Sequence, residues 1–311
     1  MTYRLPTIPF LKLRFTLKAQ KDALLPYHKG SMIRGAFGNS LRHMFCLRDH
    51  GYDCEQCDSR ATCMYTRLFS PFVEKAPPKY YEGITFAPRP FVLDAMENRK
   101  SFKQGQEFSF DLILLGDRTE LFHQVILAVA RAAERGLSVR HYPFSLRQVE
   151  WKNGTWRSLF DGQSLLEIPK ARTVTNKSKK TDQIQIHFLT PTRIMIDNEY
   201  RIDFTFRELV RQMLRRTLDI AHFYVDEAAP DWDYRDYVRL SDDIQITDRH
   251  LYWEDWKRYS SPQNQKLNMG GFFGKMNVQG KLDPFMPLLK QSEVLHVGKG
   301  TVLGMGKVRV R

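Results

Sequence analysis

The chain of 311 residues is 42% hydrophobic and 13% aromatic, which is enough apolar material for two ordinary domain cores. Its 48 Lys and Arg against 35 Asp and Glu give a formal net charge of +13 and a pI near 9.6. This charge favours a polyanionic partner, with nucleic acid ahead of an anionic membrane surface, although a basic protein without such a partner would have the same composition.

The sequence argues against a membrane span and against a secretory signal. Its most apolar helical stretch, residues 121–136, is interrupted by His123 and Arg131 and is shorter than the ~20 apolar residues that a span needs. The N-terminal sequence MTYRLPTIPFLKLRF lacks the uninterrupted apolar core and the cleavage site of a signal peptide. We therefore expect a cytoplasmic protein with no membrane partner, in a compartment where thiols stay reduced.

The first half of the chain has the pattern of six elements. In FLKLRFTLK apolar and polar residues alternate, which predicts a half-buried strand. Apolar residues at helical spacing predict helices over residues 31–45 and 119–135, and RPFVLDA, QEFSFDLILLG and FSLRQVEW are predicted strands. The order β-α-β-β-α-β predicts a ferredoxin-like domain over residues 1–165, with a cysteine-rich insertion at residues 46–64.

A basic linker over residues 166–182 precedes a second half, residues 183–311. There QIQIHFLTP predicts a strand and FTFRELVRQMLRRTLDIAHFY a long helix, followed by a polar stretch containing WEDWKRYS. A strand in LNMGGFFGKMNVQG, a short helix in PFMPLLKQ and a terminal strand pair complete a second, looser β-α-β-β-α-β unit. The predicted fold class is α+β, with tandem ferredoxin-like (RRM-like) domains.

The terminal strand pair holds a glycine-rich loop, HVGKGTVLGMGKVRV. It is not a dinucleotide fingerprint, because Leu303 stands at the third glycine position. It is not a P-loop either, because Thr301 replaces the first glycine and Val308 follows Lys307. Too few residues follow for a helix to aim its N-terminus at a phosphate. What remains is a loop between two β-type segments, SEVLHV and GKVRVR, and a simple hairpin connection is the alternative.

Stretches in both halves resemble one known family. In the second half these are TPTRI, FRELVRQMLRRTLDI, WEDWKRYSSPQNQ, MGGFFGKMNVQG and the glycine-rich loop; in the first half, HKGSMIRGAFGNSLR is followed by a cysteine cluster. They resemble the pre-crRNA-processing endoribonucleases of CRISPR systems, in the RAMP superfamily. The resemblance implies tandem ferredoxin-like domains, a glycine-rich loop that packs against RNA, and metal-independent cleavage of CRISPR repeat RNA. Repeat RNA and crRNA are the implied partners, and a multi-subunit CRISPR effector complex is a further one.

Such cleavage uses the 2′-OH of the RNA as nucleophile and is expected to leave a 2′,3′-cyclic phosphate and a 5′-OH. It needs a base, an acid and a cation beside the phosphate, and histidine suits the first two roles. His28, flanked by Tyr27 and Lys29 before the first helix, could supply all three functions. His43, near the end of that helix, is the second candidate. An exposed loop histidine and a histidine that complements the helix dipole are the respective alternatives.

Basic residues and the glycine-rich loop form the predicted RNA-binding set. In the long helix of the second half, three arginines at i, i+4 and i+8 form a stripe that could follow a phosphate backbone, although a solvated helix face would have the same pattern. His296 could instead pack within the protein. The predicted RNA-binding residues are Arg34, Arg207, Arg211, Arg215, Lys257, Arg258, His296, Gly298, Lys299, Gly300, Gly304, Gly306 and Lys307.

All four cysteines of the chain, Cys46, Cys54, Cys57 and Cys63, lie within 18 residues. Clustered thiols around a C-x2-C core predict a structural Zn²⁺ site, with an iron–sulfur cluster as the minority alternative. Four protein ligands would leave no open coordination position, so we expect no metal in catalysis. Disulfides are not expected in the inferred compartment.

Two functions therefore remain at this point. The first is an endoribonuclease that cuts pre-crRNA by acid–base catalysis. The second is a catalytically inactive RAMP subunit that binds crRNA within an effector complex. The glycine-rich loop and the net charge suit both functions equally, so the position of a histidine relative to the scissile phosphate has to distinguish them.

Overall fold

The structure is a computed structural model that describes residues 3–46, 53–73, 87–174, 181–226, 232–260 and 265–311, with the side chains of residues 257–268 outside the description. The chain divides into two compact units. The C-terminal unit comprises Met1–Thr7, Val174–Ala221 and Asp226–Arg311; the N-terminal unit comprises Ile8–Thr173 and His222–Val225. The predicted linker lies partly outside the described residues, which leave out residues 175–180.

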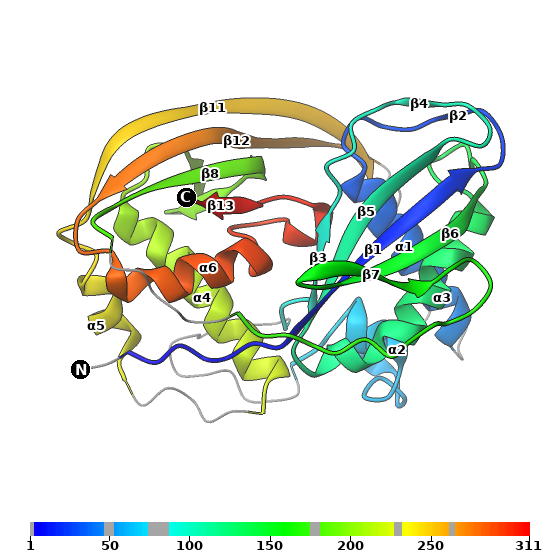
Figure 1. Ribbon diagram of the computed structural model, residues 1–311, viewed down its shortest axis with the longest axis horizontal. Helices are drawn as coiled ribbons and strands as arrows, with labels where there is room; N and C mark the ends of the chain where they lie inside the picture. Colours follow the sequence, from blue (N-terminus) through cyan, green and yellow to red (C-terminus); the bar gives the residue numbers. More distant parts are fainter. Residues whose placement is uncertain (1–2, 47–52, 74–86, 175–180, 227–231, 261–264) are drawn as a thin grey trace. The chain divides into compact units, whose positions relative to one another are not determined.

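The N-terminal unit is built on one antiparallel sheet with the strand order β3-β5-β1-β6-β7 (Figure 1). Helices α1 and α3 follow strands β1 and β5, so the predicted β-α-β-β-α-β order is present, and β7 extends the sheet. The elements are β1 (Phe10–Ala19), α1 (Gly30–Phe45), β3 (Phe91–Asp94), β5 (Glu107–Leu115), α3 (Phe122–Arg135), β6 (Phe144–Asn153) and β7 (Thr155–Phe160).

The core of this unit follows from the sequence pattern. Along β1 the side chains alternate strictly between half-buried and buried, so one face of the strand packs into the core and the other carries Lys12 and Arg14. The apolar face of α3 is buried in the same way, and the helix ends at Gly136, whose φ of 97° favours glycine. Burying these alternating apolar residues is the main driving force for this arrangement.

Two smaller features are inserted into this plan. Between α1 and β3 the described residues form a 3₁₀ turn, Cys54–Gln56, and the short helix α2 (Met64–Leu68). Residues 47–52 of the predicted cysteine-rich insertion lie outside the described residues. A two-stranded ribbon, β2 (Ala23–Leu24) with β4 (Ser101–Phe102), joins the segment before α1 to the segment before β5.

The C-terminal unit has a four-stranded sheet in the order β11-β12-β8-β13, the same relative order as β3-β5-β1-β6. Both units are therefore ferredoxin-like, as predicted. The elements are β8 (Gln183–Thr192), β9 (Ile194–Ile196), β10 (Glu199–Arg201), α4 (Phe206–Tyr224), α5 (Tyr234–Arg239), β11 (Gln245–Ser260), β12 (Gln265–Gln279), α6 (Met286–Leu295) and β13 (Val308–Val310). In Figure 1 the long strands β11 and β12 arch over the other elements of this unit.

Two sequence predictions in this unit are wrong. The polar stretch WEDWKRYS belongs to strand β11, which pairs with β12 along almost its whole length. Its side chains do not alternate clearly between apolar and polar, so periodicity could not detect it. The segment SEVL, expected to be β-type, completes α6, and the chain turns sharply at His296. Only β13 forms the terminal strand, beside β8.

The C-terminal sheet also has a core face and an open face. On β8, Ile184, Ile186 and Phe188 are buried in a cluster with residues from α4 and α6, and Val308 and Val310 of β13 join them. The residues between them point to the opposite face, as the period of a strand requires. Within the described residues, no helix has the length and apolar character needed to cross a membrane.

Candidate active site and RNA-binding loop

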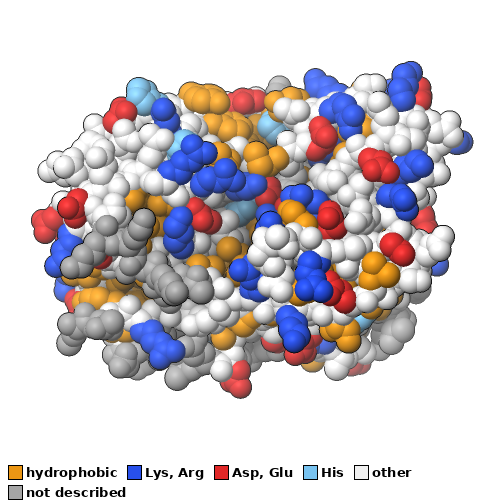
Figure 2. Space-filling view, viewed as in Figure 1, with side chains coloured by type: hydrophobic (Ala, Val, Ile, Leu, Met, Phe, Trp, Pro, Cys, Tyr) orange, Lys and Arg blue, Asp and Glu red, His pale blue; other side chains and the backbone are white. Residues whose placement is uncertain are grey.

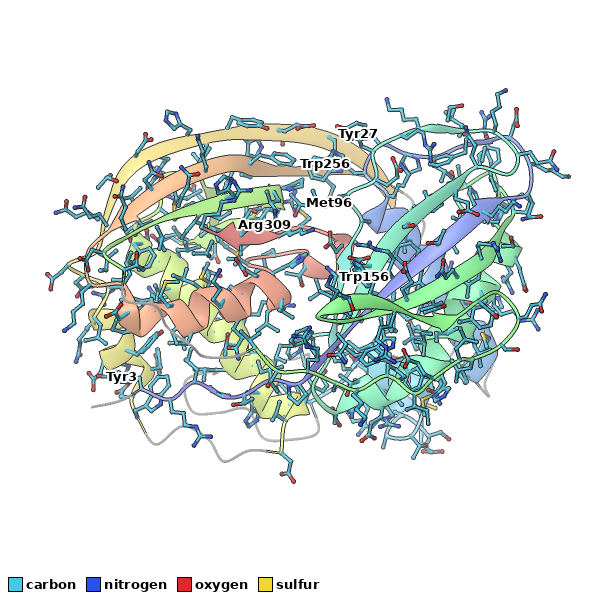
Figure 3. All side chains as sticks on the ribbon, in the orientation of Figure 1. Tyr3, Tyr27, Met96, Trp156, Trp256 and Arg309 are labelled. Carbon is cyan, nitrogen blue, oxygen red and sulfur yellow. The ribbon has the colours of Figure 1, made fainter. Side chains whose placement is uncertain are left out.

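The loop before α1 places a phenol beside an imidazole. Tyr27 is 45% exposed and His28 is half-buried, and their rings meet edge to face with 4.9 Å between centroids. The Tyr27 hydroxyl accepts a hydrogen bond from Asn98 Nδ2 at 3.2 Å. Figure 3 labels Tyr27 on this loop. A proton-transferring ring and a hydroxyl therefore share one accessible surface, which is the arrangement that acid–base chemistry needs.

Lys29 does not have the role that the sequence suggested. Its side chain is fully buried, and its ammonium donates to the carbonyl oxygens of Pro26, Glu97 and Arg99 at 3.1, 3.1 and 2.6 Å. Burial lowers the pKa of Lys29 to about 8. An ammonium has three donors, so none is left to bind a phosphate. Lys29 joins two segments of the fold and is not the cation of the site in this structure.

Lys100, in the segment before β4, is a cation beside this loop that no local sequence pattern indicates. It is exposed, and its ammonium lies 5.9 Å from the centre of the Tyr27 ring. The backbone bond from Leu25 N to Lys100 O, at 2.8 Å, holds the two segments together beside the β2–β4 ribbon. More than 70 positions separate Lys100 from Tyr27 in the chain, so only the tertiary pairing reveals their proximity.

His43 lies in a different environment near the end of α1. Arg135 Nη2 lies 3.3 Å from His43 Nε2, and a guanidinium can only donate, so Nε2 accepts. The proton of the neutral ring is then on Nδ1, which donates to Asn39 O at 2.7 Å. His43 is thus an exposed neutral imidazole beside a guanidinium, a second pair that could bind a phosphate and transfer a proton.

The structure does not bring the two histidines together. His28 precedes α1 (Gly30–Phe45) and His43 lies in its last turn, so about 20 Å of helix axis separates them. His28 and His43 therefore cannot act on the same phosphate, and at most one of them belongs to the site of cleavage.

The glycine-rich loop is shaped by contacts within the protein. Gly298, Gly300, Gly304 and Gly306 all have positive φ, between 75° and 85°. A Cβ at Gly298 would lie 2.1 Å from Arg193 O, and one at Gly306 would lie 1.9 Å from Val297 O. The close backbone approach that these two glycines permit is therefore to the protein's own backbone.

Other residues of this loop divide between the interior and the surface. His296 is 1% exposed, has a φ of 59°, and its Nδ1 lies 3.0 Å from Met305 O, so it packs as the sequence analysis allowed. Gly304 and Gly306 are buried as well, which removes them from any RNA-facing surface in this structure. Lys299 is exposed and Lys307 is half-buried. The lysines, and not the glycines between them, are the groups that this loop presents.

The arginine stripe of α4 is only partly available. Arg207 is paired with Asp242, with oxygens at 2.6 and 2.8 Å, whereas Arg211 and Arg215 are exposed on the same helix. Arg216, next to the stripe, is directed inward, where its Nε donates to Leu295 O at 2.6 Å and burial lowers its pKa to about 10. Arg216 therefore anchors the end of α6 below the glycine-rich loop.

The remaining predicted RNA contacts are Arg34, which is half-buried, and two residues of β11 whose side chains are not described. Arg34 on α1 is half-buried, with its guanidinium carbon 4.6 Å from the centre of the Phe69 ring. Lys257 and Arg258 lie on β11, opposite Asn268 and Leu267 of β12, but their side chains are outside the described part of the chain.

The cysteines lie around the 3₁₀ turn and at the ends of α1 and α2. Each is half-buried, and none of the four is in a disulfide. Burial raises the pKa of Cys54, Arg42 lowers it, and the other three cysteines raise it further. Among the described residues, no three His, Cys, Asp or Glu side chains converge closely enough to hold a metal ion. The donor set suits Zn²⁺, but the coordinating geometry is not formed here.

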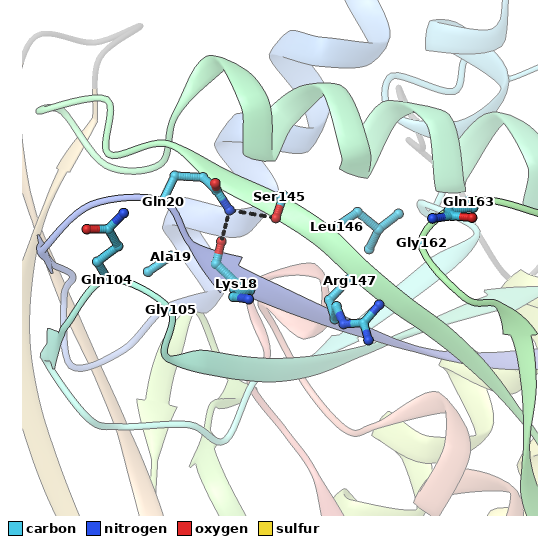
Figure 4. A pocket seen from close by; sticks show the side chains of 10 residues that line it. All are labelled: Lys18, Ala19, Gln20, Gln104, Gly105, Ser145, Leu146, Arg147, Gly162 and Gln163. Atoms are coloured by element: carbon cyan, nitrogen blue, oxygen red, sulfur yellow. Dashed lines mark hydrogen bonds between the residues drawn. The ribbon is translucent and has the colours of Figure 1, made fainter.

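A polar hollow of about 670 Å³ opens on the N-terminal unit (Figure 4). Gln20 Nε2 spans part of it, donating to Ser145 Oγ at 2.7 Å and to Lys18 O at 3.2 Å. Lys18 and Arg147 line it, and no acid–base pair does. The hollow therefore lacks the groups that a cleavage site needs.

Comparison with known proteins agrees with the fold. One family model, described as an N-terminal domain, matches residues 7–176, and another, described as CRISPR-associated endoribonuclease Cas6, matches residues 186–308. Residues 186–308 therefore belong to the Cas6 family of CRISPR-associated endoribonucleases. No curated protein matches the chain.

Solved structures share the Cas6 fold at low sequence identity. A Cas6 product complex has a TM-score of 0.56 and 16% identity, with 97% of this chain and 99% of that one covered. A Cas6 from Thermus thermophilus has a TM-score of 0.54 and 16% identity, with 99% and 100% covered. A partial Cas6-RT-Cas1–Cas2 complex has a TM-score of 0.56 and 14% identity, and the match covers 99% of this chain but only 47% of that one. At these identities the matches establish the fold.

Proposed function

We propose that this Cas6-family protein binds CRISPR repeat RNA and cuts pre-crRNA into mature crRNA, without a metal ion in the chemical step. The match of residues 186–308 to the Cas6 endoribonuclease family is the observation that carries the proposal. The net charge of +13 supports a polyanionic substrate. The loop at Tyr27 and His28 provides the acid–base groups that such a reaction needs.

In the proposed reaction the neutral ring of His28 removes the proton of the 2′-OH, and the 2′-oxygen attacks the adjacent phosphorus. The bond from phosphorus to the 5′-oxygen breaks, and the Tyr27 hydroxyl donates a proton to that leaving oxygen. The products are a 2′,3′-cyclic phosphate and a 5′-OH. Lys100, whose ammonium is exposed beside Tyr27, balances the charge of the phosphorane, in place of the buried Lys29.

RNA is held, in this proposal, by exposed cations. Lys299 of the glycine-rich loop and Arg211 and Arg215 of α4 are accessible, whereas His296, Gly304 and Gly306 are buried and are not RNA contacts. A related solved structure is a Cas6-RT-Cas1–Cas2 complex, and we propose that this chain likewise works with other CRISPR proteins, in the cytoplasm.

The test is cleavage of labelled repeat RNA in excess EDTA by the wild type, His28→Ala, His43→Ala and the exposed control His123→Ala. Loss of an acid–base group should lower the rate by about 10²-fold or more. We expect that loss in His28→Ala alone. Loss only in His43→Ala would move the site to the His43–Arg135 pair, and full activity in both variants would disprove both assignments. Complete loss of wild-type cleavage in EDTA would contradict metal independence.

The second function, a subunit that binds crRNA without cutting it, is favoured by one observation. The predicted group of histidine, tyrosine and lysine is incomplete, because the Lys29 ammonium is enclosed by three carbonyl oxygens. Tight binding of repeat RNA by the wild type without cleavage would establish this alternative.

We also propose that Cys46, Cys54, Cys57 and Cys63 bind a structural Zn²⁺. The clustering of all four thiols in one insertion supports the proposal. Metal analysis of the purified protein should find about one zinc per chain, and Cys54→Ser should lose it and melt at a lower temperature. Iron with visible absorbance would favour the iron–sulfur alternative. If the purified protein contains neither zinc nor iron, the proposed site is disproved.

A further inference from the structure

The open face of the C-terminal sheet carries a row of cationic and imidazole side chains that crosses all four strands. The register pairs His250 of β11 with Lys275 of β12, Lys275 with His187 of β8, and His187 with Arg309 of β13. Directly paired residues point to the same face of a sheet, so these four side chains form one line. His250, Lys275 and Arg309 are exposed and His187 is half-buried. Figure 3 labels Arg309 on β13.

Lys275 and Arg309 lie on either side of His187 in this row, so two cations flank one half-buried ring. No acidic residue stands in the row, and Arg311 follows it on β13. Burial lowers the pKa of His187, and Arg311, Lys275 and Arg309 lower it further, which shows that the groups share one positive field. Figure 2 shows Lys and Arg side chains gathered where β8 and β13 lie in this view.

A chain of hydrogen bonds links His187 to the next row of the same face, which consists of Gln185, Asn277 and Asp248. His187 Nε2 lies 2.5 Å from Gln185 Oε1, Gln185 Nε2 donates to Asn277 Oδ1 at 2.8 Å, and Asn277 Nδ2 donates to Asp248 Oδ2 at 3.3 Å. Because Gln185 Oε1 can only accept, Nε2 of His187 carries a proton. The ring is thereby held in one orientation, with Nδ1 on its other side.

Two aromatic side chains lie next to this row on the same face of the sheet. Tyr252, two positions after His250, is 60% exposed and stacks on Phe273 with 5.7 Å between centroids and 14° between planes. The register pairs these two residues directly. An exposed ring supported from one side by a second ring offers its other face to a stacking partner, and nucleobases stack on such rings.

We propose that this face is a binding platform for single-stranded RNA, on which Lys275, His187 and Arg309 contact successive phosphates and Tyr252 stacks a base. The row spans three inter-strand distances of about 4.8 Å, or about 14 Å, which accommodates a short stretch of backbone. Ferredoxin-like sheets with aromatic side chains on the open face bind RNA in this manner in other proteins. The inference rests on the proposed function, because it assumes that the polyanion is RNA, and it adds a binding surface separate from the cleavage groups.

The test is fluorescence anisotropy with a labelled single-stranded 12-nucleotide oligouridylate, in the full-length protein at several salt concentrations. The variants are Lys275→Ala, Arg309→Ala, Tyr252→Ala and Tyr252→Phe. The matched control is Arg239→Ala, which also removes one exposed cation from the C-terminal unit, but on α5. Thermal melting checks that each variant is folded.

Each lost phosphate contact should reduce the slope of log affinity against log salt by about 0.7. We expect this change in Lys275→Ala and Arg309→Ala but not in Arg239→Ala. Tyr252→Ala should weaken binding about tenfold, and Tyr252→Phe should not, because the ring that stacks is retained. Wild-type binding in all three face variants, or an equal loss in the control, would overturn the platform.

Cleavage of repeat RNA separates this inference from the proposed function. If the wild type cuts repeat RNA and the face variants bind oligouridylate normally, only the platform is wrong. If the face variants lose oligouridylate binding and the wild type does not cut, the platform stands and the endoribonuclease proposal falls. If the wild type binds neither RNA, both are wrong.

Discussion

The two sheets share one relative strand order, but the cations on their open faces have different surroundings. On the N-terminal sheet the two cations at the centre of β1 are paired with acids: Lys12 lies 3.3 Å from Asp94 and 2.9 Å from Asp111, and Arg14 bonds Asp111 at 2.8 and 3.2 Å. The hydrogen bonds that Arg14 donates to Asp111 raise the pKa of Arg14. Arg14 also lies over the ring of Trp156, labelled in Figure 3.

On the C-terminal sheet the row from His250 to Arg309 holds no acid, and Asp248 reaches only His250 from the next row, at 3.0 Å. The difference shows that topology fixes where side chains point, while the residues opposite each cation decide whether it is used inside the protein or offered to a ligand. The N-terminal face uses its cations internally, and the C-terminal face offers them.

The largest expected effect compares two glycines, one in each unit. Gly306 and Gly154 both have a φ of 75°, but a Cβ at Gly306 would lie 1.9 Å from Val297 O, whereas nothing lies within 4 Å of one at Gly154. Gly154→Ala should therefore cost about 1 kcal/mol of backbone strain, and Gly306→Ala about 3 kcal/mol or more. Urea unfolding measures both free energies. Equal losses would show that the glycine-rich loop is not held by its own backbone contacts.

The second effect concerns the acids of the two faces. Asp111→Asn leaves Lys12 and Arg14, which are 23% and 35% exposed, without their main counter-charge. We expect a loss of about 2 kcal/mol in the free energy of unfolding, discounted for that exposure. Asp248→Asn is the matched change on the C-terminal face, where the 43% exposed carboxylate should be worth about 0.5 kcal/mol or less. Similar losses in denaturant titrations would remove the contrast between the faces.

The third effect compares how two arginine substitutions, one on each sheet, change the affinity for RNA. Arg14→Ala and Arg309→Ala each remove one positive charge from a sheet face, but only Arg309 is outside an ion-pair network among the described residues. At about 0.1 M salt the affinity for oligouridylate should fall roughly fivefold in Arg309→Ala and less than twofold in Arg14→Ala. Equal effects of the two substitutions in anisotropy titrations would show that net charge, and not the C-terminal face, determines binding.

The smallest effect is a dependence on pH. The pKa of His187 is lowered by burial and by the cations around it, so the ring is neutral near pH 7. Phosphate favours the protonated form, so affinity should rise about threefold between pH 7.5 and pH 5.5. The other groups facing this ring are Gln185, Lys275, Arg309 and Arg311, with Asp248 and His250 beyond them.

His187→Gln should abolish this gain, and His250→Gln should leave most of it. A gain that survives in His187→Gln would assign the titration to another group.

Much of the fold could be predicted because burial imposes a period on the sequence. The alternation in β1 and β8 and the apolar stripe of α3 identify these elements before any contact is known. Strand β11 escaped detection because much of its length is polar, and its pairing with β12 defines it as a strand. The segment SEVL reads as a strand when it is considered by itself. In the structure it forms the last four residues of helix α6.

The candidate site was predictable only as far as local sequence reaches. The adjacent Tyr27 and His28 and the clustered cysteines are visible as neighbours in the chain. The enclosure of Lys29, the approach of Lys100 and the pairing of His43 with Arg135 depend on residues 68 or more positions away, so no motif could show them.

The sequence by itself determined the tandem fold, the excess of positive charge and the position of the glycine-rich loop, because each depends on composition or on a short period. Only the tertiary structure decided what those residues do. It packed Gly298 and Gly306 against the protein's own backbone and buried Lys29 among carbonyl oxygens. By strand register alone, it aligned His250, Lys275, His187 and Arg309, which are scattered over more than 120 positions of the chain, into one row.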